Sequence, residues 1–263
     1  FIKMYSSNEL NTINLPVISL YQKASLMSKV TTQALYGENF KVLEKHKKWY
    51  LIELKDDNYK GWTSEYNNKI FFETTHIVNV SNTWVLSSPN IKSKPLMKLF
   101  SGSKLKVLDF HETWFLVEVY KNKITNGYIP KSHLTKLNKH LHWLKIIKQF
   151  QNAPYFWGGK TINGIDCSGL LQLGTKFSGL NIPRDTHDQE KYFKNTIFES
   201  KSDNLKIFSD FKKGDIIFWK GHVAIIINKN KLIHANAHHM KVKIETIASA
   251  LKRINQKYIV KRI

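Results

Sequence analysis

The chain of 263 residues contains one cysteine, Cys167, which lies between Asp166 and the dipeptide Ser168-Gly169. Asp is a favourable N-cap residue, so Cys167 is expected in the first turn of a helix. There the positive end of the helix dipole lowers the pKa of a thiol, and the thiolate is a strong nucleophile. A lone cysteine is commonly an inert buried residue, but a packing role is not expected between an Asp and Ser-Gly at a helix start. The setting therefore indicates a nucleophile, and a single cysteine excludes both an intramolecular disulfide and an all-cysteine zinc site.

Two of the 11 histidines are placed to serve that cysteine. His222 begins the apolar segment 223–227, and His234 ends the next strand-like run, after the short hairpin 228–231. Histidines on neighbouring antiparallel strands can lie side by side, so His234 can hold the ring of His222 in the tautomer that accepts a thiol proton. Paired histidines also occur in metal sites, but the chain has no HExxH motif. We therefore expect a Cys-His-His site with no metal and no other cofactor.

The elements that must position these residues begin with an internal repeat. Two segments match at an offset of 65 residues, and the matching pairs include Gly37 and Gly102, Phe40 and Leu105, Val42 and Val107, Trp49 and Trp114, and Glu53 and Glu118. Each copy has short alternating apolar runs separated by polar turns, which is typical of small antiparallel barrels. We expect residues 1–75 to form an N-terminal segment and a first barrel, and residues 76–138 to form a second barrel.

The pattern changes after Leu137. Apolar residues at helical spacing predict helices in segments 143–150 and 167–177, and strand-like runs follow at 216–219, 223–227, 232–234 and 242–244. Helices followed by an antiparallel set of strands are an α+β order, not alternating βαβ units. Residues 139–263 are therefore expected to form an α+β catalytic domain.

Both parts of the chain resemble known families. The repeated segments are similar to bacterial SH3-like domains, and residues 32–38 and 59–62 of the first copy carry the likeness. Residues 139–263 resemble the catalytic domain of the NlpC-type cysteine peptidases, papain-like enzymes that cut bacterial cell-wall peptides. The matching motifs stand in family order at 154–159, 166–169, 183–186 with Gln189, 214–218, 221–224 and 232–235.

The resemblance implies an α+β fold class: a papain-like cysteine peptidase domain preceded by two small all-β SH3-like barrels. It assigns Cys167 as the nucleophile, His222 as the base and His234 as the polar third residue. With two barrels in front, the arrangement is similar to enzymes of the dipeptidyl-peptidase VI type. These γ-D-glutamyl-L-diamino acid peptidases release L-Ala-γ-D-Glu from murein peptides with a free amino terminus. The expected reaction is hydrolysis of the bond from γ-D-Glu to a diamino acid, either lysine or diaminopimelate.

A substrate with a free ammonium needs carboxylates at a fixed distance from the scissile bond, and Asp166 and Asp185 fit that need. The resemblance implies an amine pocket lined by Tyr155, Asp166, Ser168 and Asp185, walled by Trp157 and closed by Glu38 and Tyr59 of the first barrel. Structural explanations stay open for these residues: an N-cap for Asp166, a surface ion pair with Arg184 for Asp185, a core position for Trp157, a turn acid for Glu38 and a barrel residue for Tyr59. The backbone N–H of Cys167 is an expected donor to an oxyanion, and the hydroxyl of Tyr155 is the candidate for the second donor. A structural aromatic role stays open for Tyr155.

Lys and Arg number 41 against 20 Asp and Glu, and the formal charge of +21 suits anionic partners. The lysines are scattered evenly and no basic-aromatic strand motif or recognition helix is present, so no nucleic-acid partner is expected. No apolar stretch reaches the roughly 18 residues of a membrane span. We expect a monomer that binds murein peptides in the cytoplasm, with the periplasm or secretion as the alternative. Two other functions stay open: an endopeptidase acting on intact peptidoglycan stems, and a non-catalytic wall-binding module.

Overall fold

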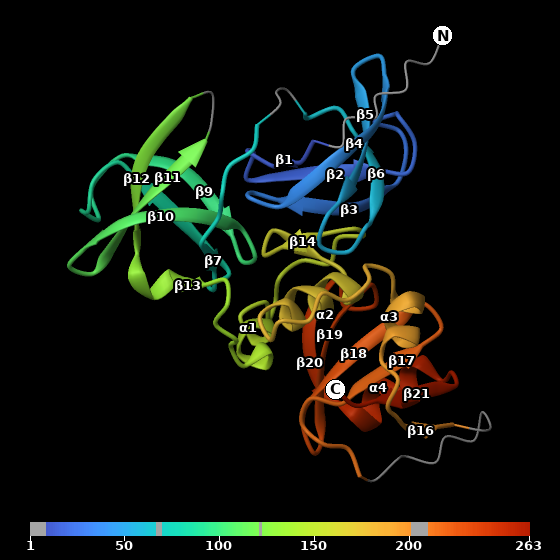
Figure 1. Ribbon diagram of the computed structural model, residues 1–263. Helices are drawn as coiled ribbons and strands as arrows, with labels where there is room; N and C mark the ends of the chain where they lie inside the picture. Colours follow the sequence, from blue (N-terminus) through green and yellow to red (C-terminus); the bar gives the residue numbers. More distant parts are fainter. Residues whose placement is uncertain (1–8, 67–69, 121–122, 201–209) are drawn as a thin grey trace. The chain divides into compact units, whose positions relative to one another are not determined.

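The computed structural model describes residues 9–66, 70–120, 123–200 and 210–263. The chain forms two compact units, residues 1–140 and 141–263. Figure 1 colours the strands of the first unit blue through green, and the second unit yellow through red. No helix among the described residues is long and apolar enough to cross a membrane.

The first unit consists of two sheets of short strands (Figure 1). The first sheet has the order β1-β4-β5-β6-β2-β3, with β1 Asn11–Thr12, β2 Val17–Tyr21, β3 Val30–Leu35, β4 Asn39–His46, β5 Trp49–Leu54 and β6 Lys60–Thr63. The second has the order β13-β7-β10-β11-β12-β8-β9, with β7 His76–Val78, β8 Asn82–Leu86, β9 Pro95–Phe100, β10 Lys104–His111, β11 Trp114–Tyr120, β12 Ile124–Pro130 and β13 Leu134–Lys136. Each sheet has its own cluster of buried apolar side chains, which is what alternating strands produce when one face is covered.

The internal repeat is preserved in the backbone hydrogen bonds. The N–H of Gly37 donates to the carbonyl of Ile13 at 2.8 Å, and 65 residues later the N–H of Gly102 donates to the carbonyl of Val78 at 3.0 Å. Both glycines have positive φ, 79° and 91°. The β4–β5 and β10–β11 pairs also share a register shift at corresponding positions. The two halves of the first unit are therefore two copies of one module.

The second unit is built on a six-stranded antiparallel sheet with the order β16-β21-β17-β18-β19-β20. Its elements are α1 Trp143–Lys148, β14 Lys160–Thr161, β15 Gly164–Ile165, α2 Cys167–Lys176, α3 Thr186–Tyr192, β16 Thr196–Glu199, β17 Ile216–Trp219, β18 His222–Asn228, β19 Lys231–Asn236, β20 Lys241–Thr246, α4 Ile247–Ile254 and β21 Tyr258–Lys261. Helix α2 lies against β18 and β19, whereas α4 packs in one apolar cluster with Ala224, Ile226 and Leu232. The intervening residues of β18 are buried as well. Both faces of this strand are covered, which explains its unbroken apolar run.

The predicted fold class, an α+β domain behind strand-rich modules, is confirmed. Helices α1 and α2 and strands β17 to β20 lie where the apolar patterns predict them. Helices α3 and α4 and strands β16 and β21 were not anticipated.

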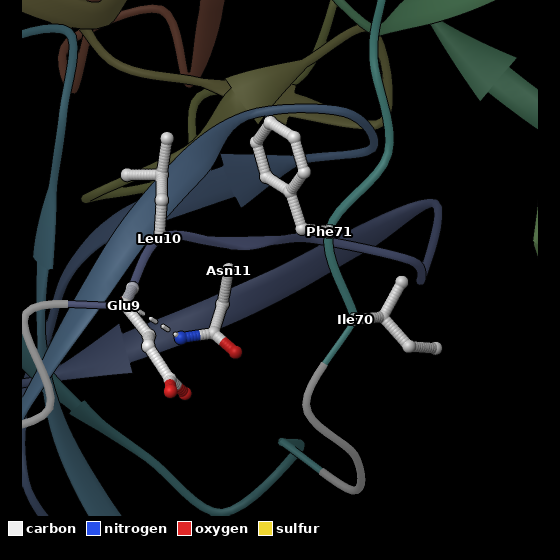
Figure 2. A pocket seen from close by; sticks show the side chains of 5 residues that line it. All are labelled: Glu9, Leu10, Asn11, Ile70 and Phe71. Atoms are coloured by element: carbon white, nitrogen blue, oxygen red, sulfur yellow. Dashed lines mark hydrogen bonds between the residues drawn. The ribbon is translucent and has the colours of Figure 1, made fainter.

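A surface pocket of about 420 Å³ lies in the first unit, lined by Glu9, Leu10, Asn11, Ile70 and Phe71. Figure 2 shows the side chains of Leu10 and Phe71 extending to the same side, while Nδ2 of Asn11 donates to the carbonyl oxygen of Glu9 at 3.2 Å. No residue predicted for catalysis or substrate binding lines this pocket.

The turn at Gly37 tests how tightly the two modules are joined. The N–H of Lys104 donates to the carbonyl of Tyr36 at 2.8 Å, and a Cβ at position 37 would collide with the carbonyl of Lys104. Gly221 has a similar φ of 75°, but a Cβ there meets nothing within 4 Å. We expect Gly37→Ala to lower the free energy of unfolding of the first unit by about 3–5 kcal/mol, since strain and overpacking add. The control Gly221→Ala should cost the second unit only about 1–2 kcal/mol, the strain alone. Urea titration measures both losses, and equal losses would contradict the crowding at Lys104.

Candidate active site

Cys167 is the first residue of α2, and its thiol is buried. Asp166 is the N-cap, with Oδ1 accepting the N–H of Gly169 at 2.7 Å. The backbone N–H of Val223, at the start of β18, donates to the sulfur, and Oγ1 of Thr186 lies 4.0 Å from it. The thiol therefore lies where the N-terminal ends of α2 and α3 meet the start of strand β18.

Burial and the neighbouring Asp166 carboxylate raise the pKa of the Cys167 thiol to about 11. The N–H of Val223, Thr186 and Arg184 have smaller opposing effects. Any lowering by the helix start is outweighed in the free enzyme by burial, the largest cause, and by the N-cap, which is itself an anion beside the sulfur. The thiol must therefore give its proton to a base when it attacks.

His222, the first residue of β18, and His234, in β19, form a hydrogen-bonded pair. The register pairs Ile225 with Ile233, so the two histidines share a face of the sheet and are diagonal neighbours. Nε2 of His222 lies 2.8 Å from Nδ1 of His234. The ring of Trp219 stacks on His222 with centroids 5.6 Å apart, and this buried indole shields the pair from water.

The hydrogen-bond partners determine which ring nitrogens carry protons. Nε2 of His234 lies 2.7 Å from Oε1 of Glu245, in β20. A carboxylate only accepts, so Nε2 of His234 is protonated and its Nδ1 accepts from Nε2 of His222. Burial, the largest cause in each case, lowers the pKa of both rings to about 3, so both are neutral at pH 7. Nδ1 of His222 is left unprotonated, as the base for a thiol proton must be.

Among the described residues, His234, His239 and Glu245 bring possible metal-ligand atoms within 4.8 Å of one another. Two observations favour a hydrogen-bonded relay over a cation at this place. The guanidinium of Arg253 donates to the same oxygen of Glu245 and would repel a cation. A metal on Nε2 of His234 would also force the proton to Nδ1, which reverses the donor and acceptor of the histidine pair.

The Asp166 carboxylate has a second set of partners on Oδ2. This oxygen accepts the N–H of Gly158 at 2.8 Å and Nη2 of Arg184 at 2.7 Å. Nη1 of Arg184 donates to Oγ of Ser168, also at 2.7 Å, and Arg184 is only 2% exposed. Arg184 is buried, and its salt bridge with Asp166 lies inside the domain and not at the surface.

Three further predicted residues lie in the second unit. Burial raises the pKa of Tyr155 to about 12, and Cys167 and Asp166 add to the shift, so its hydroxyl is neutral and can donate. Trp157 is 63% exposed, which excludes the core position considered for it. Asp185 is an exposed N-cap of α3 whose side chain makes no capping hydrogen bond.

Glu38 and Tyr59 lie in the first unit, and the other predicted site residues lie in the second. Glu38 is buried, and its Oε2 accepts the N–H of Leu35 at 2.9 Å. In the second module Ser103 accepts the N–H of Phe100 at 3.3 Å in the same way. Tyr59 is half-buried beside the turn at Asp57, which accepts its N–H at 3.0 Å. Glu38 thus stabilises its turn by accepting a backbone hydrogen bond, and Ser103 accepts the equivalent hydrogen bond in the second module.

Sequence reasoning missed four side chains that touch this site: Thr186, Glu245 and Arg253, and Arg184 as the partner of Asp166. Thr186 and Arg184 belong to the 183–186 motif, so a signal for them was present. Glu245 and Arg253 belong to no motif, and only the strand register and the path of α4 bring them to the histidines.

The thiol lies at a helix start and accepts the N–H of Val223, the residue that follows His222 of the histidine relay. This is the arrangement of a papain-like thiol hydrolase. Comparison with known protein families identifies which kind of thiol hydrolase this is. Residues 152–262 match the NlpC/P60 family, and residues 20–65 match the bacterial dipeptidyl-peptidase Sh3 domain. The chain therefore has an NlpC/P60 domain behind a bacterial dipeptidyl-peptidase SH3 domain and is a cysteine peptidase, as the sequence motifs predicted. The SH3 match covers the first copy of the repeat.

Similar proteins extend over both units. The chain is 26% identical over 256 residues to the dipeptidyl-peptidase 6 of Lysinibacillus sphaericus, covering 87% of this chain and 88% of that protein. It is 25% identical over 252 residues to the gamma-D-glutamyl-L-lysine dipeptidyl-peptidase of Bacillus subtilis (strain 168), covering 84% and 77%. A crystal structure of an NlpC/P60 family protein from Bacillus cereus ATCC 10987 has the same fold, with a TM-score of 0.79, 20% identity and coverage of 97% and 99%.

The buried pair of Arg184 and Asp166 gives a test by stability. Arg184→Met leaves a buried carboxylate without its cation, so the free energy of unfolding should fall by about 3–5 kcal/mol. The control Lys60→Met removes a pair with Glu53 in which the Lys60 side chain is 57% exposed, and the change should stay below about 1 kcal/mol. Urea titration of both variants decides. A loss below about 1 kcal/mol for Arg184→Met would show that N–H groups alone stabilise Asp166.

Proposed function

We propose that this protein hydrolyses the bond between γ-D-Glu and a diamino acid in murein peptides that carry a free N-terminal L-Ala. The chemistry is supported by the position of the Cys167 thiol at the start of α2 and by the neutral, hydrogen-bonded His222–His234 pair. In this proposal the pair supplies the general base. The names of the two dipeptidyl-peptidases support the substrate class, because the likeness to them extends over most of this chain.

In the proposed reaction, Cys167 Sγ attacks the γ-carbonyl carbon while Nδ1 of His222 takes the thiol proton. The oxyanion forms near the backbone N–H of Cys167 and the Tyr155 hydroxyl, our proposed donors. The C–N bond then breaks, and His222 returns its proton to the leaving amine. Water attacks the thioester with His222 again as the base, which regenerates the thiol and releases the acid product.

The two aspartates of the proposed amine pocket have different tasks. Both oxygens of Asp166 are engaged by N–H groups, and one also pairs with Arg184, so its charge is largely compensated. Asp185 is exposed at the N-terminus of α3, where a substrate ammonium can reach it. We propose Asp185 as the carboxylate for the substrate ammonium and Asp166 as the residue that shapes the pocket with Ser168. The exposed Trp157 forms its wall.

Glu38 and Tyr59 are proposed to complete the amine pocket from the first module. The turn chemistry supports a recognition role for Glu38, since Ser103 satisfies the equivalent turn without a charge. The turn needs only a hydrogen-bond acceptor at this position, so the negative charge of Glu38 is not required for the turn itself.

We further propose that the enzyme is a monomer, uses no nucleic-acid partner and acts on soluble peptides in the cytoplasm, where thiols stay reduced. The second candidate is an endopeptidase acting on intact peptidoglycan stems. It is favoured only by the formal charge of +21, which suits an anionic wall.

Active-site variants test the chemistry. Cys167→Ala should lower kcat by several orders of magnitude with peptide binding retained, and His222→Ala should be nearly as damaging. His234→Ala should be milder, because it removes the partner of the base and not the base itself. The measurement is turnover of L-Ala-γ-D-Glu-Lys and of the diaminopimelate peptide by mass spectrometry. Activity lost to a chelator and restored by zinc would contradict a thiol mechanism.

Acetylation of the substrate tests the amine pocket. A blocked amine leaves desolvated carboxylates unpaired, so kcat/KM should fall at least about a hundredfold for the acetylated peptide. Asp185→Asn and Glu38→Gln should each reduce that preference while turnover of the free peptide continues. Asp188→Asn, a second acid of α3 without an assigned role, is the control. Equal rates on free and acetylated peptides, with intact sacculi cut as fast, would support the endopeptidase instead.

A further inference from the structure

Glu245 ends the hydrogen-bonded chain that runs from His222 through His234. The proposed function gives this residue no role. We propose that Glu245, held by Arg253, is a positioning residue that keeps the His222–His234 pair in the one tautomer able to accept the thiol proton. The inference rests on the proposed function, in which His222 is that acceptor.

The sheet places the three side chains in a diagonal line across β18, β19 and β20. The register pairs Leu232 with Glu245 and His234 with Lys243, so Glu245 is diagonal to His234, as His234 is to His222. His234 is fully buried and the Glu245 side chain is only 11% exposed. Water therefore has little access to the far end of the relay, and the carboxylate is the acceptor present there.

The histidine pair alone can hold its shared proton in two ways. Either Nε2 of His222 donates to Nδ1 of His234, or the reverse, and each arrangement makes one hydrogen bond between the rings. In the reverse arrangement Nδ1 of His222 carries a proton and cannot accept one from the thiol. An acceptor at Nε2 of His234 selects the first arrangement, because Nε2 must then be the protonated nitrogen. Glu245 is that acceptor at 2.7 Å.

Arg253 determines how the carboxylate is presented. It lies in the last turn of α4 and donates to Oε1 of Glu245, the same oxygen that accepts from His234. Among the residues that the structure describes, the other charged or titratable groups near the relay are His238, His239 and Lys243, and none of them offers an acceptor with a full negative charge. His234 and Arg253 both donate to Oε1 of Glu245, so this oxygen is held in place by two hydrogen bonds.

This convergence allows a sharp choice of variants. Glu245→Ala removes the acceptor and leaves the Arg253 cation as the nearest charge to His234, which favours an unprotonated Nε2 and hence the reverse arrangement. The value of kcat should therefore fall about 30–100-fold while KM changes less than about threefold. Glu245→Gln should stay within about fivefold of the parent, because Arg253 holds the amide oxygen toward His234. Arg253→Met alone should also stay within about fivefold, because a carboxylate has only acceptors to present. The double variant frees the amide to turn its NH₂ group to His234, and its kcat should fall to the level of Glu245→Ala.

Lys243→Ala is the matched control, because Lys243 is also half-buried and lies on the same face of β20, two residues from Glu245. It should leave kcat within about twofold of the parent. A loss in this control as large as in Glu245→Ala would mean that any disturbance of β20 lowers activity, which would overturn the proposal.

The tautomer itself is measured by two-bond ¹H–¹⁵N correlation spectra of histidine-labelled protein in the Cys167→Ala background. Nδ1 of His222 should be unprotonated in the parent and protonated after Glu245→Ala. An unchanged tautomer, or a kcat loss below about threefold, overturns the proposal. If Glu245→Ala does not fold, the double variant against its two single variants gives the same decision. Full turnover by Cys167→Ala would sink the proposed function, whereas the spectra would still report on Glu245.

Discussion

The carboxylate of Asp166 is the group on which the site depends. It caps α2 through Gly169, receives the N–H of Gly158 and pairs with Arg184. These contacts connect the loop before β14, the start of α2 and the segment before α3. A buried carboxylate is costly unless it is paired and hydrogen-bonded. The buried guanidinium of Arg184 is therefore as necessary as the cap itself.

The same carboxylate also affects the thiol. A helix start normally favours a thiolate, but here burial, the largest cause, and the anion that caps the helix raise the pKa of Cys167. The resting site consequently holds a neutral thiol and neutral histidines. Activation must come from a base whose free nitrogen faces the right way. Which ring nitrogens of His222 and His234 carry protons is therefore more important for activation than a thiolate in the resting enzyme.

Much of the site's residue content was predictable from sequence, because its signals are local. Asp166 before Cys167 predicts the helix start, and the apolar run after His222 predicts a strand, which the fold then covers on both faces. Helix α3 is polar along almost all of its length and α4 has only eight residues, so a helical pattern was not recognised in either segment. Arg184 was considered only as a surface partner for its chain neighbour Asp185, whereas folding buries it beside Asp166, 18 residues away. Glu245 depends on the β19–β20 register, which no local pattern encodes.

A neutral resting pair also links reactivity to substrate binding. While no carbonyl lies next to Cys167, the proton stays on sulfur, since its pKa lies well above that of His222. In the proposed mechanism, proton transfer becomes favourable only when the new C–S bond and the oxyanion donors stabilise the negative charge that develops. Stacked against Trp219 and aligned through His234, the His222 ring would need no reorientation at that moment. The sheet thus supplies in advance the orientation that the reaction would otherwise have to organise, while the thiol remains unreactive until a substrate carbonyl arrives.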